Sequence, residues 1–442
     1  MPYTSLFRGH KLLPCTQVET RMMPEDGDTT QPAYRWFVAS RQALGMKVHG
    51  ANDDGNPNRP KAFPPTGVET KGAWTSTTGH PDPGVRGNRE QRPKHAHGNV
   101  SSTYAALDLG TNNCRLLVAR PSRRGFVVVD AFSRIIRLGE GLGANGKLSQ
   151  GAMDRTVDAL RVCASKIARH GVGRSRLVAT EACRVASNGT EFLARVRRDL
   201  GLDIELLSRE DEAKLAVSGC ASLLDTSSDL ALVFDIGGGS TELIWLDLSR
   251  RRGQWRRGIA DRLEAHACIA AWTSLPVGVV TLADRFDGRT MGASEFEVMV
   301  EEVIRLISPF EAEHRFGPRL ASERVHLLGT SGTVTTLAGI KLGLPRYDRS
   351  RVDGLWLSTE DLRHVTYDLV GKTYEQRVAE PCIGRDRADL VLAGCAILEA
   401  LMRIWPTERL RVADRGLREG ILSTLMGEDG FHREHGNGTS GR

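Results

Sequence analysis

Residues 235–242 combine two acidic side chains with three consecutive glycines. The stretch reads Asp235-Ile-Gly-Gly-Gly-Ser-Thr-Glu242, and an apolar run lies on each side of it. This pattern predicts a β-hairpin whose turn is the glycine loop. Glycines let backbone N–H groups come close to an anion, and successive N–H groups in such a turn form a nest for phosphate oxygens.

The two acids beside this nest would repel a phosphate. A divalent cation between carboxylate and phosphate removes that repulsion, because Mg²⁺ in proteins is commonly held by one or two carboxylates together with substrate phosphates. The loop therefore predicts a Mg²⁺-dependent phosphate site, and Mn²⁺ would suit the same hard oxygen ligands. For the glycines alone, the alternative is a tight hairpin that binds nothing.

A second stretch repeats this signature. Residues 108–117, Asp-Leu-Gly-Thr-Asn-Asn-Cys-Arg-Leu-Leu, align with residues 235–244 as D-[LI]-G-x₅-L-[LI]. The same strand–loop–strand therefore opens each half of the chain, and an internal repeat of this kind predicts two related α/β domains. Each domain would offer one loop to the cleft between them, which makes a phosphate clamp.

Hydrophobic periodicity predicts the order βββαβαβα for the first half and a similar order for the second. In the first half we expect strands at 104–108, 115–120, 126–132, 177–180 and 204–207, and helices that begin after Ser149 and span 189–200 and 210–223. In the second half we expect strands at 230–235, 242–248, 325–328 and 409–413, and a third strand that the pattern does not place. The expected helices there are 276–285, 294–316, 333–342, 359–369, 385–404 and 416–426.

Residues 1–101 differ in composition from the rest. They are rich in Pro, Gly, Asp and Asn without sustained periodicity, so we predict a disordered extension with one short helix near 34–44. A translation start placed too far upstream would explain the segment equally well. His95 and His97 could contact a metal, but two isolated histidines in such a segment are a weak signal. The predicted domains are 102–226 (closed by a helix within 414–427) and 227–413, followed by a loose tail, 428–442.

Composition indicates a soluble cytoplasmic protein. No apolar run approaches a membrane span, the N-terminus lacks the apolar region of a signal peptide, and the eight cysteines show no metal-like spacing. The net charge of +6 suits an anionic substrate without indicating nucleic acid. The basic run 250–257 would either steer a polyanion toward the cleft or form a solvated hairpin tip.

Five pieces of the chain resemble the exopolyphosphatase/guanosine pentaphosphate phosphohydrolase (Ppx/GppA) family. They are residues 105–117, 179–184, 208–214, 235–242 and 329–333, and the closing 412–422 also fits. The resemblance spans about 103–426 and places the chain in the actin/hexokinase/acetate-kinase superfamily. It implies two actin-like (ribonuclease H-like) domains that clamp a phosphate chain and Mg²⁺. The chain looks like the short, two-domain form, and Asn113-Cys114 departs from the usual Ser followed by another residue.

The resemblance also implies roles for acidic residues. Asp108 and Asp235 would bind Mg²⁺, directly or through water, and Glu212 would take a proton from the attacking water. Glu242 would assist by orienting that water or holding the metal. The structural alternatives are loop caps for the two aspartates and, for Glu212, a helix-N-terminal acid that interacts with the dipole.

Phosphate oxygens are expected to meet donors from three loops and one arginine. Gly329, Thr330, Ser331 and Gly332 lie between a strand and a helix N-terminus, which suits an anion but also describes an ordinary βα turn. Arg184 has the planar fork that fits multi-oxygen anions, unless it is a plain surface residue. The other expected donors are Thr111, Asn112, Gly237, Gly238, Gly239, Ser240 and Thr241.

The resulting expectation is a Mg²⁺-dependent hydrolase that releases the terminal phosphate of polyphosphate or of guanosine pentaphosphate, pppGpp. Both substrates present a phosphoanhydride to the same loops, so the sequence does not separate them. The alternatives are a superfamily phosphotransferase, for which no adenosine pocket is evident, and a non-catalytic polyphosphate or (p)ppGpp sensor. The resemblance also suggests a homodimer, and neither a membrane nor a specific nucleic acid is expected as a partner.

Overall fold

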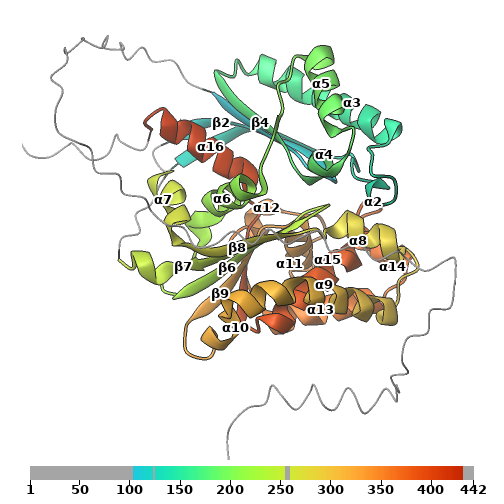
Figure 1. The fold of residues 1–442 in the computed structure, drawn as a ribbon, viewed down its shortest axis with the longest axis vertical. Coiled ribbons are helices and arrows are strands. Elements are labelled where there is room, and N and C mark those ends of the chain that lie inside the picture. The colour runs from blue at the N-terminus through green and yellow to red at the C-terminus, as the bar shows by residue number, and fades with distance from the viewer. Residues whose placement is uncertain (1–102, 123–124, 254–258, 432–442) are drawn as a thin grey trace, which may run out of the picture. The chain divides into compact units, whose positions relative to one another are not determined.

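The structure is a computed structural model that describes residues 103–122, 125–253 and 259–431. A five-stranded sheet of order β3-β2-β1-β4-β5 forms the first domain, and a six-stranded sheet of order β10-β11-β9-β6-β7-β8 forms the second (Figure 1). Each sheet joins an antiparallel meander to parallel strands, as expected for actin-like domains. The expectations for 1–101, including the helix near 34–44 and the two histidines, lie outside the described residues, as does most of the tail.

The first domain places its apolar central strand between two layers of helices. Leu107 and Leu109 of β1 pack with the cluster under α3 and α5, while Tyr104 and Ala106 face the other layer, which includes α16 (Leu417–Glu428). A strand covered on both faces is apolar nearly throughout, which explains the sequence of β1. The elements are β1 (Tyr104–Leu109), β2 (Asn113–Ser122), β3 (Gly125–Ile135), α2 (Leu142–Asn145), α3 (Gln150–Arg169), β4 (Arg174–Ala179), α4 (Glu181–Val185), α5 (Gly189–Leu200) and β5 (Glu205–Leu206).

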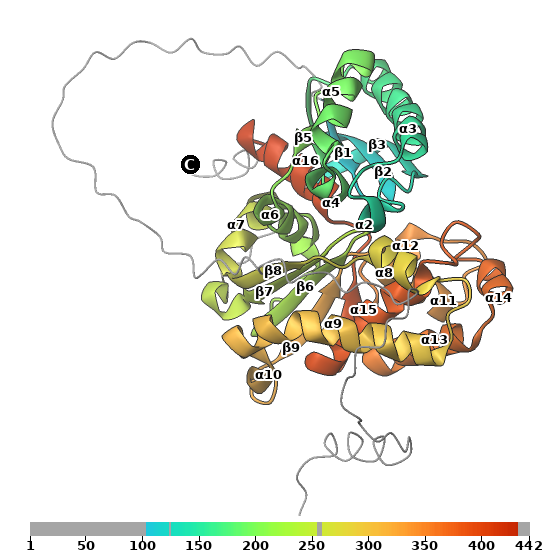
Figure 2. The same cartoon turned by 45° about the vertical axis from the view of Figure 1, so that its right-hand side comes forward.

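The second sheet is also covered on both faces. Figures 1 and 2 show α9, α13 and α15 on one side, where the largest apolar cluster lies, and α6 and α7 on the other. Its strands are β6 (Leu230–Ile236), β7 (Thr241–Asp247), β8 (Ile269–Leu275), β9 (Val325–Gly329), β10 (Trp356–Ser358) and β11 (Arg409–Val412). Its helices are α7 (Ile259–Glu264), α8 (Val279–Phe286), α9 (Ala293–His314), α10 (Phe316–Arg319), α11 (Gly332–Lys341), α12 (Arg349–Val352), α13 (Thr359–Gly371), α14 (Tyr374–Ala379) and α15 (Val391–Ile404), with 3₁₀ turns η2 (Leu248–Arg251) and η3 (Ala265–Cys268).

Helices α6 (Arg209–Cys220, continued by η1, Ala221–Leu223) and α16 (Leu417–Glu428) pack against each other between the two sheets. Glycines allow this close approach. A Cβ at Gly219 would lie 1.8 Å from the Gly416 carbonyl oxygen, and one at Gly420 would lie 2.0 Å from that of Leu215. The pair fixes the orientation of α6, whose first turn carries Glu212.

Several short helices, α2, α4, α7, α10, α12 and α14, were not predicted from the sequence, and three further details of the second half differ from the expectations. The third strand of the second half is β8, whose alternate residues are buried, but Ala270 and Ala271 weaken its hydrophobic pattern. Strand β10 has only three residues and was not predicted. The helix expected from 385 begins at Val391, because residues 384–390 form turns that approach the cleft.

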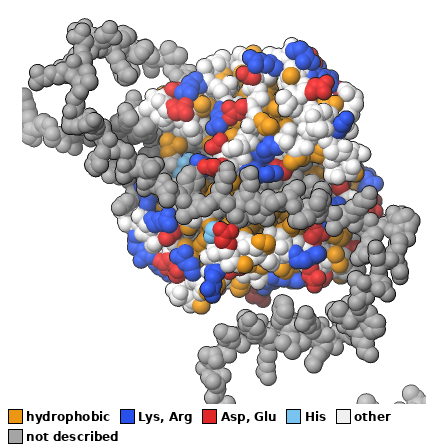
Figure 3. Space-filling model, viewed as in Figure 1, with side chains coloured by type: hydrophobic (Ala, Val, Ile, Leu, Met, Phe, Trp, Pro, Cys, Tyr) orange, Lys and Arg blue, Asp and Glu red, His pale blue; other side chains and the backbone are white. Residues whose placement is uncertain are grey.

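The surface offers a test of the basic run at 250–257, of which residues 250–253 are described. Arg250, Arg251 and Arg252 pair with Asp247, Glu264 and Asp229 respectively, so their charges are compensated locally. Figure 3 shows basic and acidic side chains interspersed over the face in view. Because these charges are already paired, the described part of the run is better explained as a solvated hairpin tip than as a surface that steers a polyanion toward the cleft. Across the ranges that the structure describes, we find no helix both long and apolar enough to cross a membrane.

Candidate active site

The repeated signature forms two matching hairpin turns. Gly110 N–H donates to the Asn113 carbonyl, and Gly237 N–H donates to that of Ser240, both at 2.9 Å. The strand register places Asp108 opposite Arg115 in one hairpin and Asp235 opposite Glu242 in the other. The two halves therefore place an acid at the same structural position.

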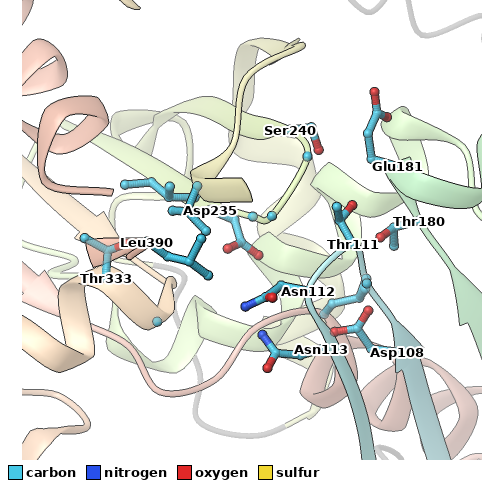
Figure 4. Close-up of a pocket in the computed structure, with 18 of the residues that line it drawn as sticks. Asp108, Thr111, Asn112, Asn113, Thr180, Glu181, Asp235, Ser240, Thr333 and Leu390 are labelled. Atoms are coloured by element: carbon cyan, nitrogen blue, oxygen red, sulfur yellow. The ribbon is translucent and has the colours of Figure 1, made fainter. Parts of the chain in front are cut away.

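Both turns line one cavity of about 130 Å³. Figure 4 shows Thr111, Asn112 and Asn113 of the first turn beside Asp235 and Ser240 of the second hairpin. The turns touch closely, since a Cβ at Gly238 would lie 2.9 Å from Thr111 Cβ and 3.0 Å from the Asn112 nitrogen. Only glycine fits this approach, so backbone N–H groups are available near the cavity.

Five carboxyl groups line this cavity, and Asp108, Asp235, Glu212 and Glu242 lie there together with Glu181. The pKa is raised for the first four of them. Burial and the charge of Glu212 together raise the pKa of Asp235 to about 7. Burial and the Glu242 charge raise the pKa of Glu212 to about 8, while burial and Asp235 raise that of Glu242 to about 7. Burial also raises the pKa of Asp108. The positive charge around these four acids is too small to keep all of them ionised.

This donor set fits a hard divalent cation that is shared with a substrate. Among the described residues, no group of three or more His, Cys, Asp or Glu side chains is close enough to hold a metal alone. Mg²⁺ does not need such a cage, because it commonly uses one or two carboxylates, water and substrate phosphates. Asp108 and Asp235, both at the ends of central strands, are the carboxylates that fit this use.

Glu212 is held by a buried ion-pair network. Arg184 donates from Nη1 to Glu212 Oε2 at 2.8 Å and to the Leu207 carbonyl at 2.7 Å. Its Nε and Nη2 donate to Glu181 Oε2 at 3.1 and 2.8 Å, and Arg209 donates to Glu181 Oε1 at 2.9 Å. The α6 N-cap, Ser208, accepts from the Asp211 N–H and fixes the turn that carries Glu212.

This network corrects the expectation for Arg184. Its donors are used on Glu181, Glu212 and a carbonyl, and it is absent from the cavity lining. Its side chain is only 12% exposed, so it is not a plain surface residue either. In this structure Arg184 orients an acid and does not line the cavity.

Three other residues that were expected to contact phosphate make contacts within the protein instead. Thr241 is fully buried and donates its hydroxyl to the Val277 carbonyl at 2.7 Å. Ser331 caps α11 by accepting from the Val334 N–H, and a Cβ at Gly329 would lie 2.7 Å from Phe234 Cζ. Thr330 lines a smaller cavity of about 30 Å³, which shares Asp108 and Asp235 with the main cavity. The remaining expected residues line the main cavity: Asp108, Thr111, Asn112, Glu212, Asp235, Gly237, Gly238, Gly239, Ser240, Glu242 and Gly332.

Two cavity arginines, Arg115 and Arg387, were not among the expected site residues. Burial lowers the pKa of Arg387, and the nearby charge of Arg115 lowers it further. Two guanidinium groups at one cavity suit a polyanion, which their planar forks can bind. The repeat alignment contained the signal for Arg115, which takes the position of Glu242 opposite the strand-end acid.

Comparisons with known proteins agree with this fold. The crystal structure of an exopolyphosphatase-like protein is 28% identical, covers 73% of this chain and 97% of its own, and superposes with a TM-score of 0.64. A Ppx/GppA family member from Aquifex aeolicus is 26% identical, with 74% and 99% coverage and a TM-score of 0.58. An exopolyphosphatase from Cytophaga hutchinsonii, at 24% identity, 74% and 98% coverage and a TM-score of 0.64, shares the fold. Residues 117–429 match the model of the Ppx/GppA phosphatase family. The chain belongs to the Ppx/GppA phosphatase family.

Proposed function

We propose that the protein is a Mg²⁺-dependent phosphohydrolase that releases the terminal phosphate of inorganic polyphosphate, of pppGpp (giving ppGpp), or of both. The main support is one cavity that brings together two glycine turns, two arginines and a buried glutamate. The turns and arginines suit a chain of phosphates, and the glutamate suits the activation of water. The seven described cysteines are free and buried, which supports a reducing, cytoplasmic location.

Hydrolysis requires a held phosphoanhydride and a water in line with its leaving oxygen. We assign the holding to the backbone of Thr111–Asn112 and Gly237–Ser240, with Arg115 and Arg387 on the outer phosphate oxygens. These groups are fixed before substrate arrives, because the turns pack against each other. A preorganised site of this kind stabilises the charge that spreads over phosphoryl oxygens in the transition state.

Glu212 is assigned as the base. Arg184 hydrogen-bonds Oε2, which leaves Oε1 to accept the proton of the attacking water. A pKa near 8 makes the ionised carboxylate a stronger base than an exposed glutamate while it remains accessible near neutral pH. We assign the orientation of the water to Glu242, whose Oε1 accepts from the Ser274 hydroxyl at 2.9 Å. When bound at Asp108 and Asp235, Mg²⁺ would neutralise phosphate charge, and Mn²⁺ could substitute.

The test is phosphate release from long-chain polyphosphate and from pppGpp, assayed side by side with and without Mg²⁺. We expect release from at least one substrate, and the ratio of the two kcat/KM values names the preferred one. Tight binding without release would instead indicate a sensor. Transfer of phosphate to a nucleoside diphosphate in place of water would indicate a phosphotransferase.

Asp235→Asn is expected to weaken the metal dependence as well as the rate. The substitution keeps the shape of the side chain but removes one of the two proposed cation-binding charges. The Mg²⁺ concentration for half-maximal activity should rise roughly tenfold or more, the scale on which changes at a metal site alter affinity. An Mg²⁺ titration curve that matches the wild type would remove Asp235 from the metal site.

Arg115→Ala is expected to raise KM roughly 10- to 100-fold, because a hydrogen bond to a charged group contributes about 1.5–3 kcal/mol. The matched control is Arg120→Ala on the same strand, whose guanidinium is exposed and donates to Thr103. Steady-state kinetics of both variants provide the comparison. Equal KM values in Arg115→Ala and wild type would exclude Arg115 from substrate binding.

A further inference from the structure

The segment between β3 and α2 braces the first phosphate turn. The N–H groups of Ile136 and Arg137 donate to the Asn112 carbonyl at 2.9 and 3.1 Å, and the Gly139 N–H donates to that of Thr111 at 2.9 Å. A Cβ at Gly139 would lie 2.2 Å from Thr111 Cγ2, so the segment lies directly against the turn. Any displacement of this segment therefore moves the turn.

The same segment contacts the second domain. Arg137 binds Asp389 through both ends of its fork, with Nη1–Oδ2 at 2.8 Å and Nη2–Oδ1 at 3.0 Å, and Nη2 also donates to the Asp386 carbonyl at 3.1 Å. The Gly141 N–H donates to Asp284 of α8 at 3.2 Å. Figure 2 shows α2 close to α8, consistent with this contact. Arg137 has a positive φ of 49°, a conformation uncommon for non-glycine residues.

Asp389 belongs to the turn that carries a cavity arginine. Arg387 lies two residues before it, and Leu390 directly follows it; both line the cavity. The turn is tight, since the Leu390 N–H donates to the Arg387 carbonyl at 3.0 Å. It also packs closely on the chain after α8, because a Cβ at Gly288 would lie 1.8 Å from the Asp389 carbonyl oxygen.

We propose that Arg137 and Asp389 form a latch across the cleft, which holds the two domains closed and keeps Arg387 in the phosphate-binding cavity. This inference rests on the proposed phosphohydrolase function and adds a positioning residue, Arg137, which acts through Asp389 and Arg387. The pair is partly exposed, with side-chain exposures of 30% and 15%. Partly exposed ion pairs contribute little net stability, so such a latch can open to admit substrate and release product.

The first test is a double-mutant cycle. Arg137→Ala is expected to lower kcat/KM roughly tenfold, mainly through KM, as is typical of coupling between two elements. If the latch acts through Arg387, Arg137→Ala should have almost no further effect in an Arg387→Ala background. The control is Arg319→Ala, which removes a two-contact pair with Glu323 of similar exposure within the second domain and should leave kcat/KM unchanged.

The second test is a charge swap. The single variant Asp389→Arg should lose as much kcat/KM as Arg137→Ala. The double variant Arg137→Asp with Asp389→Arg should recover part of that loss, because the exchange of the two side chains restores an ion pair of the same total length. Asp also tolerates positive φ. Full additivity in the cycle, or no recovery in the swap, would overturn the latch.

A third readout does not require hydrolysis. Amide hydrogen exchange of residues 384–391 should speed up in Arg137→Ala and remain unchanged in Arg319→Ala. If the wild type hydrolyses neither substrate, the proposed function fails and this exchange alone decides the latch. Faster exchange supports the latch, and wild-type exchange overturns it.

Discussion

Glu212→Gln is expected to lose about 10²–10⁴-fold in kcat, the range for removal of a general base, while the folded protein becomes more stable. The amide preserves the shape of the side chain and can still meet Arg184, but it cannot take a proton from water. It also removes a charge that burial and Glu242 make unfavourable. Activity and stability should therefore change in opposite directions.

The direction of the stability change follows from the pKa. The folded-state pKa of Glu212, about 8, lies above its ordinary value of 4.5, so the folded protein binds this proton more tightly than the unfolded chain does. The ionisation of Glu212 therefore lowers the free energy of unfolding of the wild type as the pH rises from about 4.5 toward 8. The variant has no ionisable group at this position, so its stability does not fall for this reason. Each 1 kcal/mol that the variant gains in free energy of unfolding over the wild type should raise its Tm by about 2–4 °C. The gain should be present at pH 8 and absent at pH 4.5.

Thermal unfolding at both pH values, measured without Mg²⁺, tests this directly. Glu210→Gln is the matched control, since Glu210 lies in the same helical turn but is partly exposed and pairs with Lys214. That variant should gain no stability and should keep its activity. A Glu212→Gln protein that retains wild-type kcat would exclude Glu212 as the base. The kcat/KM of the wild type should also increase with pH up to an inflection at or below 8, because a bound cation lowers the pKa.

The repeat explains why much of the fold and of the cavity was predictable. Asp108 and Asp235 end apolar strands and precede glycine-containing turns, so local chemistry alone located both hairpins. The Ser149 N-cap of α3 was likewise correct, and its hydroxyl accepts from the Ala152 N–H at 3.2 Å. Elements with strong local patterns of this kind can be recognised from their own residues, without knowledge of the tertiary contacts.

Predictions about individual side chains depended on contacts that no local pattern contains. Thr241 lies in the predicted loop, yet its hydroxyl is used by a carbonyl 36 residues away. Arg184 is committed to Glu181 and to Glu212 on another helix. Arg387 comes from a turn whose path depends on packing against Gly288. The sequence placed Thr241 and Arg184 near the cleft but did not place Arg387 there, and tertiary contacts decide which donors remain available to a substrate.

Gly238→Ala is expected to reduce kcat/KM about 100-fold, the loss that a 1 Å misplacement near the chemistry can cause. The added methyl would lie 2.9 Å from Thr111 Cβ, 3.0 Å from the Asn112 nitrogen and 3.2 Å from Asn112 Cβ. Two of these three atoms are side-chain carbons next to the backbone, and the third is backbone, so none can rotate away as the end of a flexible side chain would. The two turns must separate, and both sets of phosphate donors then move.

This prediction separates the packing of the turns from the general effect of adding a methyl group. Gly371→Ala, at the end of α13, places its Cβ in open space and adds a better helix former, so it should be neutral or slightly stabilising. Kinetics and thermal unfolding of both variants give the comparison. A large loss of kcat/KM in Gly238→Ala with a small change in Tm would locate the damage at the cavity. Wild-type kinetics in that variant would mean that the turns can separate without cost, and the clamp would then need a different description.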